Sequence, residues 1–354
     1  NFTLSNDILD TIKVIESMGC VVEVSKVIKV IPSKLNNKTF RIMESGTTYR
    51  LMIPILSALF TDFEIEVNRT LRKRPINEFE KHGLNREKKK HSWLISPGVF
   101  CVDGSVSSQY VSGLLFALPM LNGNSKIIVT NMSSDNYILM TVEVLKAFGI
   151  NIEIEDNTFL IKGNQSYKGS NYNVEPDFSA LAFWAVAGTV NGSIHIEAPE
   201  ESLQPDFEII TLLKAVADLE YNDGYHFKKS HIVPFRIDVN NCPDLAPALS
   251  VLAMYADGPC EIKGIDRLIY KESDRIKGIL KLRKFGALIE KENTLKFKQG
   301  SYHSGAIRQN DHRIAMMVGI LPEESVVKNV ESIDKSYPSF LKDLEMLGKK
   351  VEEL

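Results

Sequence analysis

The sequence predicts an α/β protein made of repeated helix–strand units, and two observations lead to this fold class. First, three segments share one pattern: a polar turn, a helix of small and apolar residues, a glycine and an alternating strand. They start at Ser107, Phe178 and Pro243, and a second amphipathic helix and a strand pair follow each start. Regular alternation of helix and strand at a repeating interval favours βαβ-type units. Second, 354 residues are enough for two domains with cores of their own.

The first elements follow from local signals. A helix is expected to begin at the Ser5-Asn6-Asp7 cap and to stop at Gly19. Its apolar face is predicted to consist of Ile8, Ile12, Ile15 and Met18. The strand-like stretch VVEVSKVIKVI follows.

Shortened copies of the repeat start at Thr47 and Asp311. The best candidate for a domain boundary is residues 171–177, where Pro176 disfavours helix at the residue before it. The charge run at residues 86–91 is predicted to be a solvated loop because it is short and lacks interleaved aromatic residues.

The composition argues against several classes of protein. The chain has 44% hydrophobic and 25% charged residues and a net charge of −3, which gives no field that attracts nucleic acid or an anionic membrane. No apolar run reaches membrane-spanning length. The four cysteines lack disulfide or zinc-site spacing and favour a reducing compartment: Cys20, Cys101, Cys242 and Cys260. We therefore expect a soluble, cytoplasmic protein with no nucleic-acid or membrane partner.

One acid, Asp244, follows Pro243 at the start of a helix pattern whose apolar residues include Ala248 and Met254. An acid there is commonly a partner of the helix dipole, and a general base is the functional alternative. Further along, four charged residues fall together: Lys271, Glu272, Asp274 and Arg275. Such a cluster is either a surface ion network or, inside a cleft, a tuned proton donor.

Three other polar stretches are candidates for anion binding. Residues 45–50, SGTTYR, form a turn of small residues before a helix, although simple helix capping explains them equally well. Four cations at residues 69–74 form either a surface run or an anion site. Residues 103–109, DGSVSSQ, place two hydroxyls, an amide and free N–H groups at one helix start, with double capping as the alternative.

These stretches carry a resemblance to a known family. The chain contains NNCPDLAPAL and YKESDRI in its second half, TLRKRPI and DGSVSSQ in its first half, and DHR and KSYP near its end. Together they resemble the 3-phosphoshikimate 1-carboxyvinyltransferases, also called EPSP synthases. The resemblance implies two similar domains, residues 1–175 and 176–354, each built of three repeated units. It also implies that helices pack inside and sheets outside, as an inside-out α/β barrel.

The resemblance implies roles for individual residues. Phosphoenolpyruvate binding is implied for Gly46, Arg74, Arg275, Arg313 and Lys335. Shikimate 3-phosphate binding is implied for Ser107, Ser108, Gln109, Ser134, Tyr137, Asp244 and Lys271. Asp244 is the implied general base, and Glu272 or the neighbouring Lys271 is the implied proton donor.

The chain departs from the family pattern at two positions and at its start. Glu44 stands where the family usually has Asn, and Leu51 stands where Pro is common. The chain also begins just downstream of where the family's opening motif belongs, so we expect the front of the first unit to lie outside this sequence.

The implied activity is transfer of the enolpyruvyl group from phosphoenolpyruvate to the 5-hydroxyl of shikimate 3-phosphate, with release of phosphate, in the shikimate pathway to aromatic amino acids. We expect these two substrates as partners, no cofactor or metal, and a monomer. Two alternatives stay open. A UDP-N-acetylglucosamine enolpyruvyl transferase shares the fold and the donor, but is expected to carry a reactive loop cysteine and to lack SSQ together with YKESDR. A catalytically inactive relative would act as a binding module.

Overall fold

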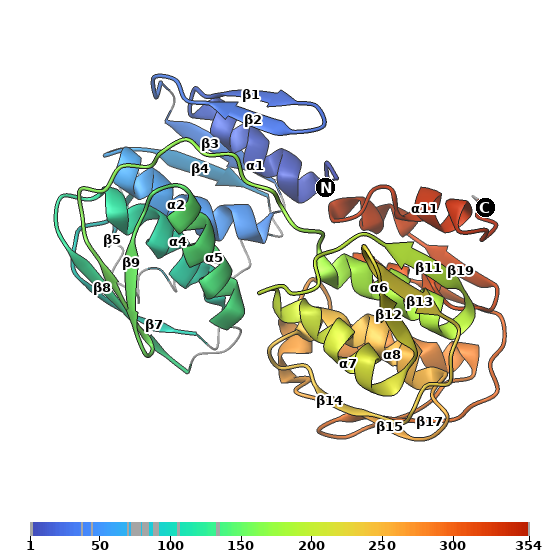
Figure 1. The fold of residues 1–354 in the computed structure, drawn as a ribbon. Coiled ribbons are helices and arrows are strands. Elements are labelled where there is room, and N and C mark those ends of the chain that lie inside the picture. The colour runs from blue at the N-terminus through green and yellow to red at the C-terminus, as the bar shows by residue number, and fades with distance from the viewer. Residues whose placement is uncertain are drawn as a thin grey trace. The chain divides into compact units, whose positions relative to one another are not determined.

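The chain divides into two compact units, which we name the N-terminal unit (Leu4–Asn173) and the C-terminal unit (Val174–Leu354). The computed structural model describes residues 3–36, 38–43, 45–68, 71, 79, 85–87, 92–104, 107–131 and 135–352. Each unit has its own cluster of buried apolar side chains. Both units combine helices with strands (Figure 1), which confirms the predicted α/β class.

The N-terminal unit contains four described helices and ten strands. The helices are α1 (Asn6–Ser17), α2 (Gly46–Leu59), α4 (Ser108–Ala117) and α5 (Asp135–Ala147). The strands are β1 (Val21–Val24), β2 (Ile28–Ile31), β3 (Thr39–Ile42), β4 (Glu64–Val67), β5 (Asn85–Glu87), β6 (Ser92–Leu94), β7 (Val99–Asp103), β8 (Ser125–Thr130), β9 (Ile152–Glu155) and β10 (Thr158–Ile161).

The C-terminal unit contains six described α-helices and nine strands. The helices are α6 (Phe178–Asn191), α7 (Glu208–Val216), α8 (Ala246–Met254), α9 (Arg275–Ile279), α10 (His312–Gly319) and α11 (Phe340–Met346). The strands are β11 (Ser193–Ile196), β12 (Leu219–Tyr221), β13 (Tyr225–Lys228), β14 (Arg236–Asp238), β15 (Cys260–Lys263), β16 (Leu288–Lys291), β17 (Leu295–Lys298), β18 (Gly305–Arg308) and β19 (Ser325–Lys328).

The predicted helix–strand repeat is visible in the sheet topology. In both units a helix connects two parallel strands, β7 to β8 through α4 and β14 to β15 through α8. An antiparallel strand pair then completes each sheet, in the orders β7-β8-β10-β9 and β14-β15-β17-β16. The copies that start at Thr47 and Asp311 also lie between parallel strands, β3 with β4 and β18 with β19.

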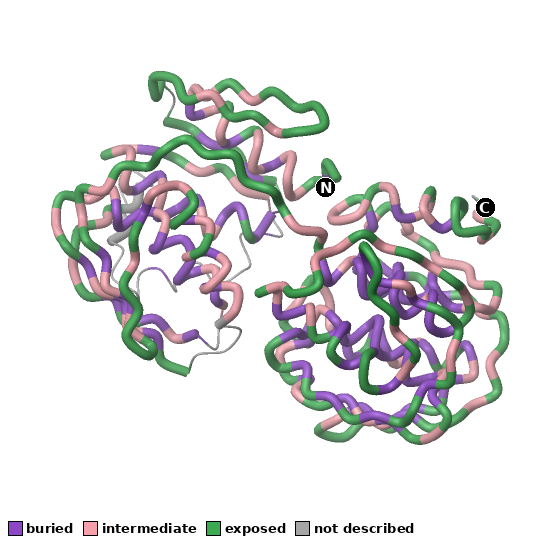
Figure 2. The backbone as a smooth tube through the Cα atoms, in the orientation of Figure 1, coloured by how far each residue is buried: buried purple, intermediate pink, exposed green. Residues whose placement is uncertain are grey.

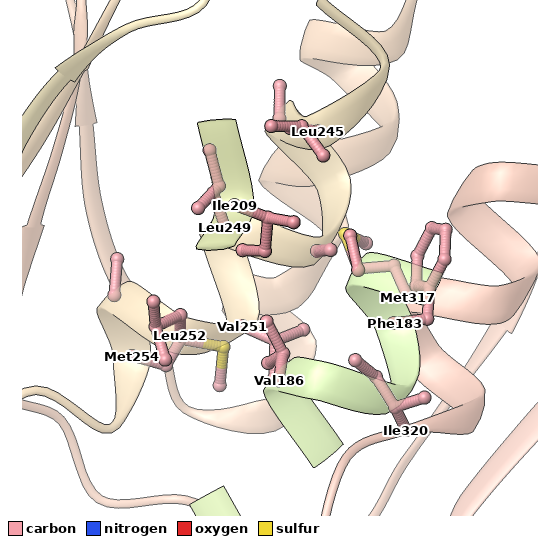
Figure 3. Close-up of a cluster of buried hydrophobic side chains, with 14 of the residues drawn as sticks. Phe183, Val186, Ile209, Leu245, Leu249, Val251, Leu252, Met254, Met317 and Ile320 are labelled. Carbon is pink, nitrogen blue, oxygen red and sulfur yellow. The ribbon is translucent and has the colours of Figure 1, made fainter. Parts of the chain in front are cut away.

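Apolar helices form the interior of the C-terminal unit. Every residue of α8 is buried, as expected for a helix that is apolar on all sides. Side chains of α6, α8 and α10 meet in one cluster, among them Phe183, Leu249 and Met317 (Figure 3). β15 and β17 bury alternate residues, so one face of their sheet packs toward the interior and the other faces outward. Figure 2 shows buried residues on the interior segments of the unit and exposed residues along its outside. This arrangement of helices inside and sheets outside confirms the predicted architecture.

Two details of the first elements differ from the prediction. On α1 the buried side is formed by Asp10, Val14 and Met18, because the Asp10 carboxylate accepts the backbone N–H groups of Met43 and Ser45, at 3.1 and 3.2 Å. The stretch after α1 is not one strand. It turns back at residues 25–27, so β1 and β2 form an antiparallel hairpin.

Candidate active site

Three helix starts in the C-terminal unit carry the predicted charged residues. The first is α8, which a short 3₁₀ turn (Pro243–Leu245) precedes. Proline fits this position because its fixed φ suits a helix start and its missing N–H has no helical partner there. Asp244 is therefore held at the entrance to a fully buried helix, with its side chain 21% exposed.

The second start is α9, where the structure corrects the prediction of one tight cluster. Asp274 caps this helix by accepting the backbone N–H of Lys277 at 3.1 Å, and its other oxygen pairs with the Lys277 ammonium. Capping turns Asp274 away from the other predicted charges. Arg275, the next residue, extends into the interior, and its side chain is only 1% exposed.

The third start is α10, which Asp311 caps. One Asp311 oxygen accepts the backbone N–H of Arg313 at 3.0 Å. Its other oxygen accepts the Ser273 hydroxyl at 2.9 Å and Nε of Arg275 at 3.2 Å. Because Asp311 is fully buried and all these contacts are short, α9 and α10 are tied together at the ends that carry the site.

Arg275 is the centre of the resulting ion network. Its three nitrogens each contact a different carboxylate: Nε contacts Asp311, Nη1 contacts Asp244, and Nη2 contacts Glu272 at 2.6 Å. A planar guanidinium can donate to three carboxylates in different directions, whereas an ammonium is a compact point charge. Each nitrogen of the guanidinium therefore has one carboxylate partner.

Three further cations surround the network. Lys271 lies 3.2 Å from Asp244, and Nε of Arg313 lies 3.5 Å from the same carboxylate oxygen. Lys335, at the end of a 3₁₀ turn (Val330–Lys335), lies 3.3 Å from Glu272. With Arg275 these make four cations beside the three carboxylates that Arg275 contacts, and Asp177 and Asp206 add negative charge near Arg313.

These contacts shift the acid–base properties of the carboxylates. Burial acts to raise the pKa of Asp244, but Arg313, Lys271 and Arg275 outweigh it and hold that pKa well below its usual range. Burial likewise opposes the attraction of Arg275 and Lys335 at Glu272, and the net pKa of Glu272 is also lowered. Both groups are therefore ionised near neutral pH.

His312 lies within the same cluster but, unlike its charged neighbours, is uncharged near neutral pH. It is buried, and its Nδ1 has no hydrogen-bond partner among the described residues. Burial, followed by the charge of Arg313, lowers the pKa of His312 to about 4 despite the nearby Glu272 and Asp311. The imidazole is consequently neutral at pH 7 and adds no charge to the network.

A separate polar group lies in the N-terminal unit. Gln109 accepts Nη1 of Arg50 at 2.8 Å and donates to the Thr47 hydroxyl at 2.9 Å. These contacts join the start of α2, which begins at Gly46, to the start of α4, which Ser107 caps. The two polar stretches SGTTYR and SSQ thus meet, although the sequence places them far apart.

The structure brings some of the predicted residues together and leaves others undescribed. Asp244, Lys271, Glu272, Arg275, Arg313 and Lys335 form one cluster in the C-terminal unit. In the N-terminal unit, Gly46 and Ser108 are buried at their helix starts, and Tyr137 is half-buried on α5. Arg74, Ser134 and Glu44 lie outside the described residues.

Sequence reasoning missed Ser179 on α6 and Ser273 before α9. Ser273 bonds Asp311, and Ser179 bonds Arg313 through both its hydroxyl and its carbonyl. The only local signal at Ser179 was Asp177 two residues earlier, which reads as an ordinary helix cap.

Two further findings concern the described part of the chain as a whole. None of its helices is long and apolar enough to cross a membrane. Within the same residues, no group of three or more His, Cys, Asp and Glu side chains is arranged to hold a metal ion.

The two α/β units and the partly buried cluster of cations fit the class of enolpyruvyl transferases. The sequence pattern of the EPSP synthase (3-phosphoshikimate 1-carboxyvinyltransferase) family matches residues 1–344, and the chain belongs to this family.

Relatives and solved structures agree with this membership. The 3-phosphoshikimate 1-carboxyvinyltransferase of Clostridium acetobutylicum is 38% identical over all of this chain and 89% of its own length. That of Clostridioides difficile is 35% identical over all of this chain and 90% of its own length. An EPSP synthase structure from Acinetobacter baumannii covers 99% of this chain and 89% of its own, with a TM-score of 0.83 at 23% identity. The enolpyruvyl transferase NikO from Streptomyces tendae covers 98% of this chain and 88% of its own, with a TM-score of 0.75 at 16% identity. At these identities the two structures are evidence for the fold alone.

Proposed function

We propose that this protein transfers the enolpyruvyl group of phosphoenolpyruvate to the 5-hydroxyl of shikimate 3-phosphate and releases phosphate. Family membership over residues 1–344 is the observation that carries the proposal. The charge cluster agrees with it, because four cations gathered in one partly buried site can bind a donor that carries a phosphate and a carboxylate.

The bond changes assign a task to each group. The acceptor hydroxyl adds to C2 of phosphoenolpyruvate and loses its proton, while C3 gains a proton. The adduct then loses phosphate from C2 and a proton from C3, which forms the enol ether. We assign removal of the hydroxyl proton to Asp244 and proton exchange at C3 to Glu272 or Lys271.

The ion network supports these assignments of proton transfer to Asp244 and Glu272. Three cations stabilise the ionised form of Asp244, so it is a poor proton acceptor. A donor anion that binds Arg313 and Lys335 adds negative charge beside Asp244 and Glu272 and partly neutralises these two cations. The pKa values of both carboxylates then rise toward their usual range, which makes proton transfer easier once the donor is bound.

The other site residues are assigned by the same family pattern. Gly46, Arg74, Arg275, Arg313 and Lys335 are proposed to bind the donor. The acceptor is proposed to bind Ser107, Ser108, Gln109, Ser134, Tyr137, Asp244 and Lys271. The monomeric state, the cytoplasmic location and the absence of a nucleic-acid partner remain predictions from the sequence.

A phosphate-release assay tests the proposal. The purified protein is incubated with phosphoenolpyruvate and one of three acceptors: shikimate 3-phosphate, UDP-N-acetylglucosamine or none. Release that requires shikimate 3-phosphate supports the proposal. Release only with the nucleotide sugar would transfer the assignment to the other enolpyruvyl transferase. No release with either acceptor, together with retained binding of shikimate 3-phosphate, would identify an inactive binding module.

A further inference from the structure

The guanidinium of Arg313 is held from a different helix by one serine. Nη2 of Arg313 donates to the Ser179 hydroxyl at 2.9 Å, and Nη1 donates to the Ser179 backbone carbonyl at 3.3 Å. Both residues are buried, with 9% and 4% of their surfaces exposed. Two terminal nitrogens of one guanidinium are thus fixed by two oxygens of one residue near the start of α6.

The serine hydroxyl is itself oriented by a carboxylate. Ser179 donates its hydroxyl hydrogen to Asp177 at 2.5 Å, and its backbone N–H donates to the same oxygen at 2.8 Å. Because the hydroxyl hydrogen is used by Asp177, the oxygen presents its lone pairs to Arg313. Asp177 therefore sets the direction in which Ser179 accepts.

This placement needs a specific explanation, because a helix start is a poor place for a cation. The first turn of a helix has a partial positive charge, which repels a guanidinium. Asp177 at the cap offsets that repulsion. An arginine side chain also has several rotatable bonds, and Ser179 restricts them before any substrate arrives.

The contacts leave one edge of the guanidinium unused by α6. Nε of Arg313 forms the 3.5 Å ion pair with Asp244, and it has no hydrogen-bond partner among the described residues. A buried N–H group without a hydrogen bond is costly, so this edge is the one that gains most from an incoming anion.

We propose that Ser179 is a positioning residue for enolpyruvyl transfer, which holds Arg313 so that its Nε edge faces the donor anion beside Asp244. The inference rests on the proposed function, because it assigns phosphoenolpyruvate to this cluster. In this proposal Ser179 acts through Arg313.

The test is a double-mutant cycle of Ser179→Ala and Arg313→Lys, with Michaelis constants measured separately for phosphoenolpyruvate and shikimate 3-phosphate. Loss of a hydrogen bond to a charged group is expected to raise the constant for phosphoenolpyruvate about tenfold or more in Ser179→Ala. The constant for shikimate 3-phosphate should change by less than about twofold. Arg313→Lys removes the fork, so adding Ser179→Ala to it should have little further effect.

A matched control removes a buried hydroxyl elsewhere in the same core. Ser250 is fully buried on α8, and its hydroxyl donates only to the Ala246 carbonyl at 2.7 Å. Ser250→Ala should leave both Michaelis constants unchanged. If Ser179→Ala has additive effects in the Arg313→Lys background, or raises both constants equally with a lower melting temperature, Ser179 is a structural residue and the inference is wrong.

The two proposals fail in different ways. A wild-type protein that transfers nothing from phosphoenolpyruvate to shikimate 3-phosphate contradicts the proposed function. An active wild-type protein whose Ser179→Ala variant keeps normal constants contradicts only the positioning role.

Discussion

At the scale of single residues, the main feature is the set of ion pairs that Arg275 makes with three carboxylates. A buried ion pair contributes little net stability when complete, but removal of one partner leaves an unpaired buried charge. Variants in this cluster therefore need two readouts, turnover and stability, so that a lost proton acceptor is distinguished from a damaged fold.

Asp244→Asn tests the proposed base. The amide keeps the size of the side chain, and Arg275 retains Glu272 and Asp311 as partners. We expect turnover to fall by about 10²–10⁴, the usual contribution of a general base, while shikimate 3-phosphate binding stays within a few-fold. The melting temperature should also fall. Turnover close to that of the wild type would remove Asp244 from the mechanism.

His312 predicts a pH dependence of stability. Its folded pKa is about 4, whereas an unfolded histidine titrates near 6.5. Between these values the unfolded chain binds the extra proton, so the free energy of unfolding falls as the pH drops from about 6.5 to about 4. The lowered pKa values of Asp244 and Glu272 contribute mainly at lower pH, where unfolded carboxyls begin to bind protons.

The measurement is chemical denaturation of wild type and His312→Gln between pH 4.5 and pH 7. In the variant, the free energy of unfolding should depend less steeply on pH, by up to about 1.4 kcal/mol per pH unit. His303→Gln, at an exposed histidine, provides the comparison. Equal slopes in wild type and His312→Gln would show that another group causes the acid sensitivity.

The sequence predicted most of the charged residues of the cluster but not the way they contact one another. Asp244, Glu272 and Arg275 occur in compact motifs, and the resemblance of these motifs to the family assigned the three residues to the site. Asp274 was misplaced because neighbours in sequence point differently once one of them caps a helix. Ser179 could not be found, because its role depends on Arg313, 134 residues away.

At the scale of helices and strands, close packing of α2 against α4 positions the polar group formed by Thr47, Arg50 and Gln109. A Cβ atom on Gly113 of α4 would lie 2.7 Å from the Arg50 carbonyl oxygen and 3.1 Å from Cγ of Pro54, both on α2. Only glycine allows this distance between the helices. The same approach brings Arg50 and Gln109 within hydrogen-bond distance.

Gly113→Ala should therefore push α2 and α4 apart. We expect a loss of about 1–3 kcal/mol of stability from overpacking, and a several-fold rise in the Michaelis constant for shikimate 3-phosphate. Gly98→Ala is the control in the same unit, since an added Cβ there meets nothing within 4 Å. Gly113→Ala with wild-type stability and kinetics would mean that the helices yield without disturbing Gln109.

The helices and strands were largely predictable, because the spacing of apolar residues along the sequence differs between a helix and a strand. Two features were not predictable from period alone. The buried face of α1 includes Asp10, whose carboxylate binds a distant loop, and tertiary contacts of this kind leave no local pattern. The β1–β2 hairpin turns at Ser25-Lys26-Val27, where serine is the only common turn residue and glycine, proline and asparagine are missing.

Two separate cores characterise the whole molecule. The buried cluster of each unit is drawn only from residues of that unit. We expect calorimetry to resolve two unfolding transitions, because a domain with its own core unfolds as its own cooperative unit.

Two leucine variants assign the transitions. Leu114 and Leu249 are fully buried, one in each core. Each Leu→Ala change removes about 2–5 kcal/mol and should lower only one midpoint, Leu114→Ala affecting the N-terminal unit and Leu249→Ala the C-terminal unit. A single transition that both variants lower equally would mean that the units unfold together.

The shared guanidinium of Arg275 also limits how this protein can change over generations. Its three partners belong to three separate segments, the starts of α8 and α10 and the loop before α9. A lineage that loses any one member carries an unpaired buried charge, at a cost of about 3–5 kcal/mol. Such a variant stays folded only if its free energy of unfolding exceeds this cost or if a second substitution compensates for it. We therefore expect Arg275 and its three partners to change together: related sequences should either keep all four residues or replace several of them at once.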